Sequence, residues 1–570
     1  MPQATSNGLS FSFIFCFLFS FPALSLNAAY LVTAELKLQA PFNKSLKTQQ
    51  NLTIAYLPPA TEYNFYLELG EAIRTKAVNK NWNFIMRAPQ NGADWQLHVE
   101  MIKEVVSKRT DIIIFSSFLP TTDKAIAPLL KQAVEQGSIV INVNSDNLNL
   151  GYPVHALIGV NQRSGTRALA QHVVTLLQPG PAKIAIIEGE PGQFSSERVG
   201  GFIDGLQGSN ISVAKRVNGH WNAVGGYYAT LKILEDTPNI RAIFAANDFE
   251  IIGASAAITH RNREDILLYG YDGVSDALAL IASKKMTATS AVNAARIGLT
   301  TFEVIVDIIN GKFKGGFVEN PLETVTIGNV DCFLDETQKA SIDIQIETFV
   351  LAAETAQDPQ IENNNNLYIE LIKAIYEPLG IRVKFEPVPY KRAEYLVVNQ
   401  RVDAMIGNFR GHSEGLYFPQ WHYHSQQIMA LFKKHSLLWQ GASSLSGKRV
   451  GWLRGYGLDR YIQVDTEKVE HTFRSSALKM LEKDRIDVYI DDQFEILKAN
   501  DGLQQNKLDL NHYQFAKLTQ LKLYPAFSNT AKGRKLARIF DQRMPLLVTS
   551  GKLAALFKKW DQTYYPFEPE

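Results

Sequence analysis

Short apolar segments alternate with amphipathic segments along the first half of the chain, and this alternation restricts the fold more than any other feature. From Leu52, the strand-like LTIAY precedes the helix-like FYLELGEAIRTKAV, and NFIMR, DIIIFSS and IVINV follow with helical segments between them. The same order resumes after His155, through KIAIIEGE, RAIFAAND and ILLYGYD. Strands that are joined by helices lie parallel and need helices on both faces of their sheet. The pattern therefore predicts an α/β fold with two such lobes.

Polar side chains follow several of these predicted strands directly, at Asn144, Glu188, Asn247, Asp248 and Asp272. Ligands of open parallel sheets bind beyond the carboxyl ends of the strands. We therefore expect a binding site for a small molecule near some of these residues. Asn247 and Asp272 are also typical of a helix cap and a turn, so a purely structural role stays open for both.

The length and charge of the chain set further limits. At 570 residues it is too long for one ordinary core, so at least two domains are expected. The 58 basic and 57 acidic residues leave a net charge of +1, which predicts no nucleic-acid partner. The sequence has no P-loop and no GxSxG nucleophile motif. We expect no enzymatic activity and no cofactor.

The N-terminus reads as an export signal. Leu9–Leu26 is an apolar, aromatic-rich run without charge, followed by small residues. We predict a signal peptide over residues 1–28, cleaved after Ser25 or Ala28, and a periplasmic protein. An uncleaved anchor helix stays the alternative. The two cysteines, Cys16 and Cys332, provide no disulfide framework.

Residues from about Leu52 to Val330 resemble the type I periplasmic binding proteins of the ribose type. The matching segments are IAYLPPATEYNFYLELGEAI, SSERVGGFIDGL, IRAIFAANDFEIIGASAAI, ILLYGYDGVSDA and KMTATSAVNAARIG. The resemblance implies a domain over residues 50–335, built of two lobes that are joined by three crossings, with a sugar or polyol in the cleft between them. It also implies a partner in the inner membrane, such as a permease.

The same resemblance implies seven ligand-binding residues in the first half. Aromatic rings stack on the C–H faces of a sugar, while Asn, Asp and Arg bind its hydroxyls. Singly, Arg198 is also compatible with a surface ion pair and Trp221 with a core position. The chain departs from the ribose pattern at Asn144-Ser145, where the pattern has an Asp-Arg pair, and at Val292, where it has a glutamine. We therefore expect a sugar or polyol other than a pentose. The seven residues are Phe65, Tyr66, Asn144, Arg198, Trp221, Asn247 and Asp272.

A second α/β pattern begins near Ala340. PYKRAEYLVVNQRVDAMIG, LSGKRVGWLRGYGLDRYI and SALKMLEKDRIDVYIDD resemble the type II solute-binding proteins of the polar amino-acid class (family 3). The resemblance implies a domain over residues 340–567 with its own hinged cleft and an amino acid or another small polar solute as ligand. Core packing for Trp452 and an ion pair of Arg392 with Glu394 stay open as structural alternatives. The implied ligand-binding residues are Tyr390, Arg392, Arg410, Trp452, Arg454 and Asp492.

Together these observations predict an exported, non-enzymatic receptor whose lobes close on a solute that is delivered to an ABC permease. The alternative is a periplasmic sensory adaptor that reports the ligand to a sensor kinase or a chemoreceptor. His422 and His424 have a conceivable zinc spacing with His412 or Glu414, but an exposed, aromatic-rich edge is the preferred interpretation, so no metal is expected.

Overall fold

The computed structural model describes residues 30–41 and 51–560, except 62, 91, 93, 118, 354–364, 411–414, 455, 457, 459–461 and 463. The predicted signal peptide and the last residues of the predicted second domain lie outside the described residues. Within them, no helix is both long enough and apolar enough to cross a bilayer.

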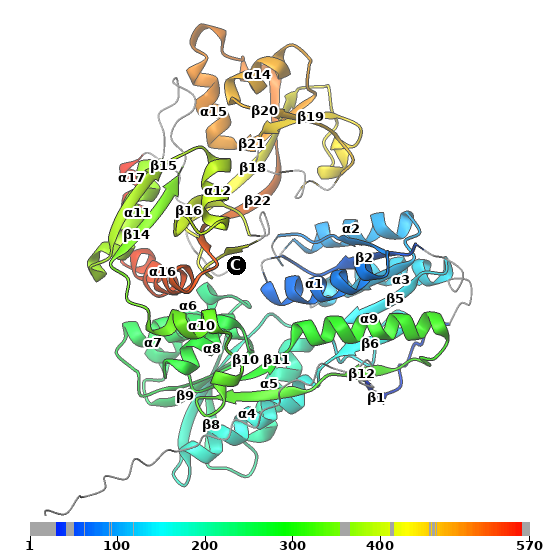
Figure 1. The fold of residues 1–570 in the computed structure, drawn as a ribbon, viewed down its shortest axis with the longest axis vertical. Coiled ribbons are helices and arrows are strands. Elements are labelled where there is room, and N and C mark those ends of the chain that lie inside the picture. The colour runs from blue at the N-terminus through cyan, green and yellow to red at the C-terminus, as the bar shows by residue number, and fades with distance from the viewer. Residues whose placement is uncertain are drawn as a thin grey trace, which may run out of the picture.

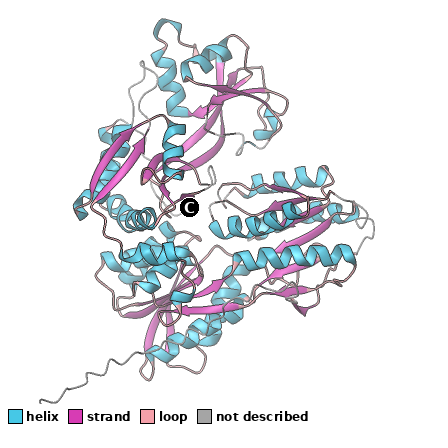
Figure 2. Ribbon diagram, in the orientation of Figure 1, coloured by secondary structure: helices cyan, strands magenta, loops and turns pink. Residues whose placement is uncertain are grey.

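Lobe 1 is a seven-stranded sheet in the order β1-β12-β6-β5-β4-β2-β3, covered by helices on both faces (Figures 1 and 2). All its pairings are parallel except that of the edge strand β1 with β12. Its elements are β1 (Leu31–Ala34), β2 (Thr53–Leu57), α1 (Asn64–Asn79), β3 (Asn83–Met86), α2 (Trp95–Ser107), β4 (Ile112–Phe115), α3 (Pro120–Glu135), β5 (Ile139–Val143), β6 (Ala156–Gly159), α9 (Ala294–Asn310) and β12 (Phe317–Glu319).

Lobe 2 is a six-stranded sheet in the order β13-β11-β10-β9-β7-β8, parallel except for its edge strand β13. The chain passes between the lobes three times, from β6 to α4, from β11 to α9 and from β12 to β13. Its elements are α4 (Gln162–Leu177), β7 (Ala182–Glu188), α5 (Gln193–Gly205), β8 (Ile211–Asn218), α6 (Ala223–Asp236), β9 (Ile240–Ala245), α7 (Asp248–His260), β10 (Leu267–Asp272), α8 (Ser275–Ala282), β11 (Ala288–Val292) and β13 (Leu322–Thr326).

The strand and helix rhythm predicted for the first half is confirmed, because each quoted segment forms the predicted element. The antiparallel edge strands β1 and β13 are the elements that differ from the predicted parallel pattern. β1 and β13 cover the last strand of their sheets without a crossover helix, so the βα alternation does not reveal them.

The C-terminal module contains a nine-stranded mixed sheet in the order β15-β14-β16-β22-β18-β21-β19-β20, with β17 beside β22. The long strand β22 joins the two halves of this sheet, because it pairs with β16 and β17 on one side and with β18 on the other. Its elements are β14 (Thr348–Ala353), α11 (Asn365–Tyr376), β15 (Arg382–Pro387), α12 (Tyr390–Val398), β16 (Ala404–Asn408), β17 (Leu416–Tyr417), β18 (His424–Lys433), β19 (Arg449–Leu453), β20 (Glu467–His471), α14 (Arg474–Glu482), β21 (Val488–Asp492), α15 (Gln493–Gly502), β22 (Tyr513–Ser528), α16 (Ala531–Thr549) and α17 (Lys552–Lys559).

Two details of the second half differ from the expectations. Ala340, taken as the boundary, lies inside helix α10 (Glu336–Asp343), which packs against α8 of lobe 2 and α16 of the module. The prediction of an exposed aromatic edge around His422 is wrong, because Trp421 and Tyr423 are fully buried. Side chains alternate along this segment, and the rings of Trp421 and Tyr423 point into the core. The prediction of an edge strand did not include this burial.

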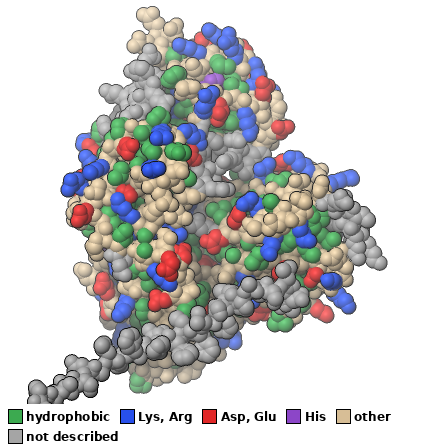
Figure 3. Space-filling view, in the orientation of Figure 1, with side chains coloured by type: hydrophobic (Ala, Val, Ile, Leu, Met, Phe, Trp, Pro, Cys, Tyr) green, Lys and Arg blue, Asp and Glu red, His purple; other side chains and the backbone are tan. Residues whose placement is uncertain are grey.

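The C-terminal module is docked on lobe 2. One core cluster joins Tyr227 and Ala257 of lobe 2 to Trp421 and Met544 of the module, and the rings of Tyr227 and Trp421 meet edge to face at 5.9 Å. Figure 1 shows the module resting on α6, α7 and α10. On the face visible in Figure 3, acidic and basic side chains are interspersed, in keeping with the net charge of +1.

We predict that Tyr227→Ala lowers the free energy of unfolding of the full chain by about 3 kcal/mol, because the ring is 2% exposed and leaves a cavity in the shared core. Denaturant unfolding measures this loss. Tyr395→Ala, at a ring that is 54% exposed, is the control and should cost little. A loss below about 1 kcal/mol for Tyr227→Ala would mean that lobe 2 and the module are not packed together.

Candidate functional site

A pocket of 540 Å³, part of it open to solvent, lies between lobe 1 and lobe 2. Its position follows from the fold, because the helix N-termini and the strand ends of both sheets meet there. All seven residues predicted for the first half lie at this pocket, together with four that the sequence did not single out. The lining residues are Tyr63, Phe65, Tyr66 and Asn144 from lobe 1, and Phe194, Arg198, Trp221, Asn247, Phe249, Asp272 and Val274 from lobe 2.

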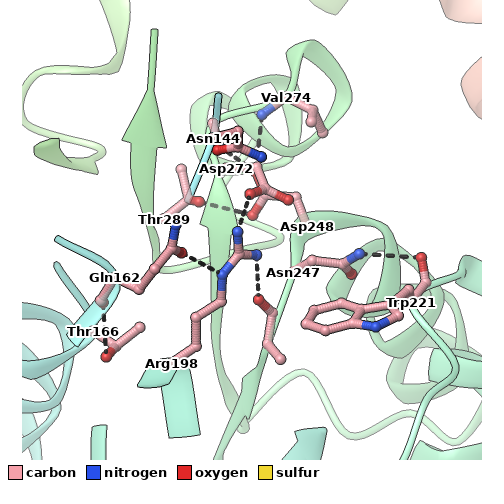
Figure 4. Close-up of polar contacts among 12 residues, drawn as sticks. Asn144, Gln162, Thr166, Arg198, Trp221, Asn247, Asp248, Asp272, Val274 and Thr289 are labelled. Carbon is pink, nitrogen blue, oxygen red and sulfur yellow. Dashed lines mark hydrogen bonds and ion pairs between the residues drawn. The ribbon is translucent and has the colours of Figure 1, made fainter. Parts of the chain in front are cut away.

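Arg198 on α5 is the charged centre of the pocket and is only 5% exposed (Figure 4). Its Nε donates to the side-chain oxygen of Gln162 and its Nη1 to the carbonyl oxygen of Ala246, both at 2.8 Å. Its Nη2 lies 3.1 Å from Oδ1 of Asp272. The guanidinium also lies 4.0 Å over the ring of Tyr271. These contacts hold the guanidinium in one orientation, and they exclude the surface ion pair that was left open for this residue.

Asp272 ends β10 with a φ of 120°, which turns its carboxylate toward Arg198. Burial raises the pKa of Asp272 to about 6, and the charge of Arg198 opposes that rise. Asp248 supports the turn from below, because its carboxylate accepts the N–H of Gly273 at 2.7 Å and of Val274 at 2.9 Å. Asp248 also accepts the hydroxyl of Thr289 at 2.7 Å, so it is a structural residue.

Asn247 lies at the pocket, but both ends of its side-chain amide form hydrogen bonds with backbone groups. Its Oδ1 accepts the N–H of Glu250 at 2.8 Å and caps α7, while its Nδ2 donates to the carbonyl oxygen of Trp221 at 3.1 Å. Glu250 closes the capping box and also accepts the N–H of Trp221 at 3.0 Å. The helix-cap role that was left open for Asn247 is therefore confirmed.

Aromatic rings form most of the remaining wall. Trp221 is 8% exposed, has a φ of 58° and packs with Phe194 in a small cluster of its own. Gly189 lies directly under its indole, and a Cβ atom there would come within 2.0 Å of the ring. Phe65 and Tyr66 meet edge to face at 5.2 Å on the lobe 1 side.

The two lobes come close to one another at the pocket. Tyr63 of lobe 1 and Phe249 of lobe 2 have ring centroids 5.8 Å apart. On the lobe 1 side, Nδ2 of Asn144 donates to the hydroxyl of Tyr66 at 3.2 Å, and Asn144 has a φ of 58°. Its Oδ1 and the second N–H of its Nδ2 accept or donate no other hydrogen bond found among the described residues.

The sequence analysis missed Tyr63, Phe194, Phe249 and Val274 as lining residues. Each of them is close in the sequence to a polar residue or a loop that was singled out. Phe249, for example, follows Asn247 by two positions. Apolar side chains at such positions give no signal by themselves, because any of them could belong to the core. They line one pocket because lobe 1 and lobe 2 pack close to one another in the folded chain.

Of the six residues predicted for the second half, Trp452 is a core residue at 1% exposure. Arg410 is buried, donates to the carbonyl oxygen of Pro419 and lies 4.6 Å over the ring of Tyr524. Arg392 lies 5.1 Å over the ring of Tyr395.

Three further residues complete that set. Arg454 is exposed, 3.9 Å from Glu470. The ring of Tyr390 lies 6.2 Å from that of Tyr456, and Asp492 caps α15. Burial, with a smaller contribution from the charge of Asp491, raises the pKa of Asp492 to about 7.

Neither half of the chain offers a metal site within the described residues, where no group of three His, Cys, Asp or Glu side chains could hold an ion. The zinc spacing considered for His422 and His424 involves His412 and Glu414, which lie outside the described residues.

Comparison with known proteins identifies the first half of the chain. The family model "Periplasmic binding protein domain" matches residues 54–313. Residues 54–313 form a type I periplasmic binding domain. The matched residues contain every lining residue of the pocket and most of lobes 1 and 2, while strands β1, β12 and β13 lie outside the match.

Curated relatives match the same part of the chain. The D-ribose/D-allose-binding protein of Pseudomonas aeruginosa is 22% identical over 280 residues, which are 47% of this chain and 86% of that protein. The ribose import binding protein RbsB of Bacillus subtilis is 27% identical over 262 residues, 46% of this chain and 83% of that protein. A solved structure of an ABC transporter periplasmic solute-binding protein from Actinobacillus succinogenes, with bound D-allose, is 21% identical, covers 49% of this chain and 99% of its own, and has a TM-score of 0.45.

We predict that Gly189→Ala displaces the indole of Trp221, because the new methyl group would overlap it, and costs about 1–3 kcal/mol of stability. Tryptophan fluorescence and thermal melting measure both effects. Gly180→Ala is the matched control, since no atom lies within 4 Å of the position of its Cβ. Unchanged fluorescence in Gly189→Ala would show that the indole is not packed on this glycine.

We predict that part of the pH dependence of stability comes from Asp248. Burial, together with the charge of Asp272, raises its pKa to about 7. At a pH between the two pKa values, the folded state therefore holds a proton on Asp248 that the unfolded state has lost. The contribution of this protonated carboxyl to the free energy of unfolding is present at pH 5 and is lost as the pH rises through 7. Asp248→Asn should reduce the fall in unfolding free energy between pH 5 and pH 8 by roughly 2–3 kcal/mol. An equal fall in both proteins, measured by denaturant unfolding, would contradict this assignment.

Proposed function

We propose that the periplasmic binding domain is a receptor for a small sugar or polyol, which it binds in the pocket between its lobes. The observation that carries the proposal is the composition of the pocket, where the fixed guanidinium of Arg198 and the carboxylate of Asp272 face aromatic rings from both lobes. A sugar has C–H faces that pack on such rings and hydroxyls that bond to charged groups. The curated relatives, named for ribose and allose, support the same class of ligand.

The distribution of polar groups narrows the class further. All three nitrogens of the Arg198 guanidinium and both ends of the Asn247 amide are engaged by protein groups, whereas no hydrogen bond to the side-chain oxygen of Asn144 is found among the described residues. We infer a ligand with hydroxyls concentrated along one edge and apolar surface elsewhere. Val292, at the position where the ribose pattern has a glutamine, supports a ligand other than ribose.

The mechanism in this proposal is closure of the two lobes. A ligand that contacts Phe65 and Asn144 on one side and Arg198 and Trp221 on the other binds the closed arrangement better than the open one. It therefore shifts the population toward the closed arrangement by its difference in affinity for the two. The ring contact between Tyr63 and Phe249 at the edge of the pocket would form as the lobes approach.

We propose that the chain is exported through its N-terminal signal and delivers its ligand to an ABC permease, as the name of the Bacillus subtilis relative, an import binding protein, suggests for that protein. For the C-terminal module we keep the proposal of a type II fold with a small polar solute bound near Tyr390 and Asp492. An amino acid is the less favoured ligand there, because Arg410 is engaged by Pro419.

A calorimetric melting panel tests the function. D-allose, D-ribose, D-arabinose, glycerol and their deoxy analogues are added to the mature chain. A sugar at about 100 times its Kd should stabilise the periplasmic binding domain by about 2.7 kcal/mol, which raises its transition by several degrees. Asp272→Asn should remove most of that shift, while Asp236→Asn on the surface of lobe 2 should retain it. If no member of the panel moves any transition in the wild-type chain, the sugar-receptor proposal fails.

A further inference from the structure

A short loop of lobe 2, residues 272–274, joins strand β10 to helix α8 and is called the pocket loop here. Asp272 and Val274 line the pocket, and Gly273 between them has a φ of 78°. Asp248 holds one side of this loop through the N–H groups of Gly273 and Val274 (Figure 4). The loop continues into the first turn of α8, which begins at Ser275 without a side-chain cap. The contacts that fix this first turn therefore also set the direction of the pocket loop.

Residues of the C-terminal module hold the first turn of α8. The hydroxyl of Tyr417, on β17, donates to Oδ1 of Asp276 at 2.7 Å, and both side chains are buried. Arg534, on α16, donates from Nη1 to the hydroxyl oxygen of Ser275 at 3.1 Å. One turn further along α16, Nη1 of Arg538 lies 4.0 Å from Oδ1 of Asp276. The two residues that directly follow the pocket loop thus take polar partners from a different module.

These partners are themselves fixed in their own surroundings. Nε of Arg534 donates to the side-chain oxygen of Asn529 at 2.9 Å, and the guanidinium lies 5.1 Å over the ring of Tyr417. Helix α10, which lies between lobe 2 and the module, adds a contact from Gln338, whose Nε2 donates to the hydroxyl oxygen of Ser275 at 3.0 Å. Because the donors cannot follow the turn freely, their hydrogen bonds restrain its position.

Asp276 is the residue of this turn that depends most on the module. Its side chain is 6% exposed, and a buried carboxylate that lacks a hydrogen-bond donor is strongly destabilising. Among the described residues, the hydroxyl of Tyr417 is the one hydrogen-bond donor found for this carboxylate. Without that donor, the carboxylate is more stable when it faces solvent, and the first turn of α8 has to move to bring it there. The pocket loop then moves with the turn.

We propose that Tyr417 and Arg534 of the C-terminal module are positioning residues for the pocket of the periplasmic binding domain. They act through Ser275 and Asp276, the two residues that connect the pocket loop to α8. The consequence for ligand affinity rests on the proposed sugar-receptor function, whereas the effect on the loop is measurable without a sugar. Linkage makes the effect reciprocal, so a ligand on the pocket loop strengthens the hold of the module on α8 by the same factor.

Hydrogen exchange in the ligand-free full chain tests the positioning of the loop. Tyr417→Phe removes the hydroxyl that donates to Asp276 and keeps the ring. Because a hydrogen bond to a charged group is lost, we expect the amides of residues 273–278 to exchange about tenfold faster, as measured by mass spectrometry. Tyr227→Phe is the matched control. It removes a buried hydroxyl at the same junction, 2.8 Å from a ring nitrogen of His260, and should leave the exchange of these amides unchanged.

Sugar affinity is the second measurement. The probe is D-allose or D-ribose, whichever raises the melting transition of the wild-type chain more. Tyr417→Phe should raise the Kd of that sugar about fivefold, at the lower end of typical coupling between two sites. Arg534→Met, which removes the donors to Ser275 and Asn529, should change the Kd in the same direction. Tyr227→Phe should bind the sugar as tightly as the wild-type chain does.

Two results would overturn the proposal. Equal exchange of residues 273–278 in Tyr417→Phe and Tyr227→Phe would show that the module does not hold the pocket loop. Faster exchange with an unchanged Kd would show that the contact is structural and does not position the site. If neither sugar binds the wild-type chain, the sugar-receptor function is contradicted for these sugars, and the exchange comparison still decides whether the module positions the loop.

Discussion

A positive and a negative charge buried side by side are the constraint on which the binding pocket depends. Arg198 is 5% exposed, and a buried guanidinium without a partner would cost several kcal/mol. Asp272 supplies the opposite charge, while Gln162 and the carbonyl of Ala246 accept the other N–H groups. These partners come from α4, from the end of β9 and from the end of β10. The pair is therefore satisfied only when lobe 2 is folded, so the chemistry of the site and the stability of the lobe are linked.

The backbone turn that positions Asp272 is stabilised by a second buried carboxylate. Asp248 accepts two backbone N–H groups and one hydroxyl, and so stabilises a backbone that leaves β10 with a positive φ. Asn144 and Trp221 also have a positive φ at this pocket. Such conformations cost of order 1–3 kcal/mol each and persist where the surrounding structure enforces them. Three of them around one space indicate that side-chain direction at the pocket is maintained at the expense of stability.

The packing of the C-terminal module changes what a two-lobed domain can do. Helices α6 and α7 of lobe 2, which would otherwise face solvent, are partly covered by α16 and the segment around Trp421. One lobe is thus extended by a second module, while the other lobe is joined to it through the three crossings.

Much of this protein follows from its sequence alone. The alternation of apolar and amphipathic segments was sufficient to predict the parallel strands and helices of both lobes, because the period of a buried element is local information. The polar residues Asn247 and Asp272 could be placed near one another, since they lie at the ends of neighbouring parallel strands of one sheet, whereas Asn144 follows a strand of the other sheet. The ribose-type resemblance added Arg198 and Trp221.

The tertiary structure decided the rest. Whether Asn247 offers its amide to a ligand or to the backbone depends on Glu250 and Trp221, which lie near it only in the folded lobe. Tyr63 and Phe249 line a pocket because two separate lobes meet, and no local pattern records a meeting of this kind. The docking of the module on lobe 2 rests on contacts between residues that are far apart in the sequence, such as Tyr227 and Trp421. Sequence periodicity encodes which face of an element is buried, whereas the identity of the surface that buries it is a property of the whole fold.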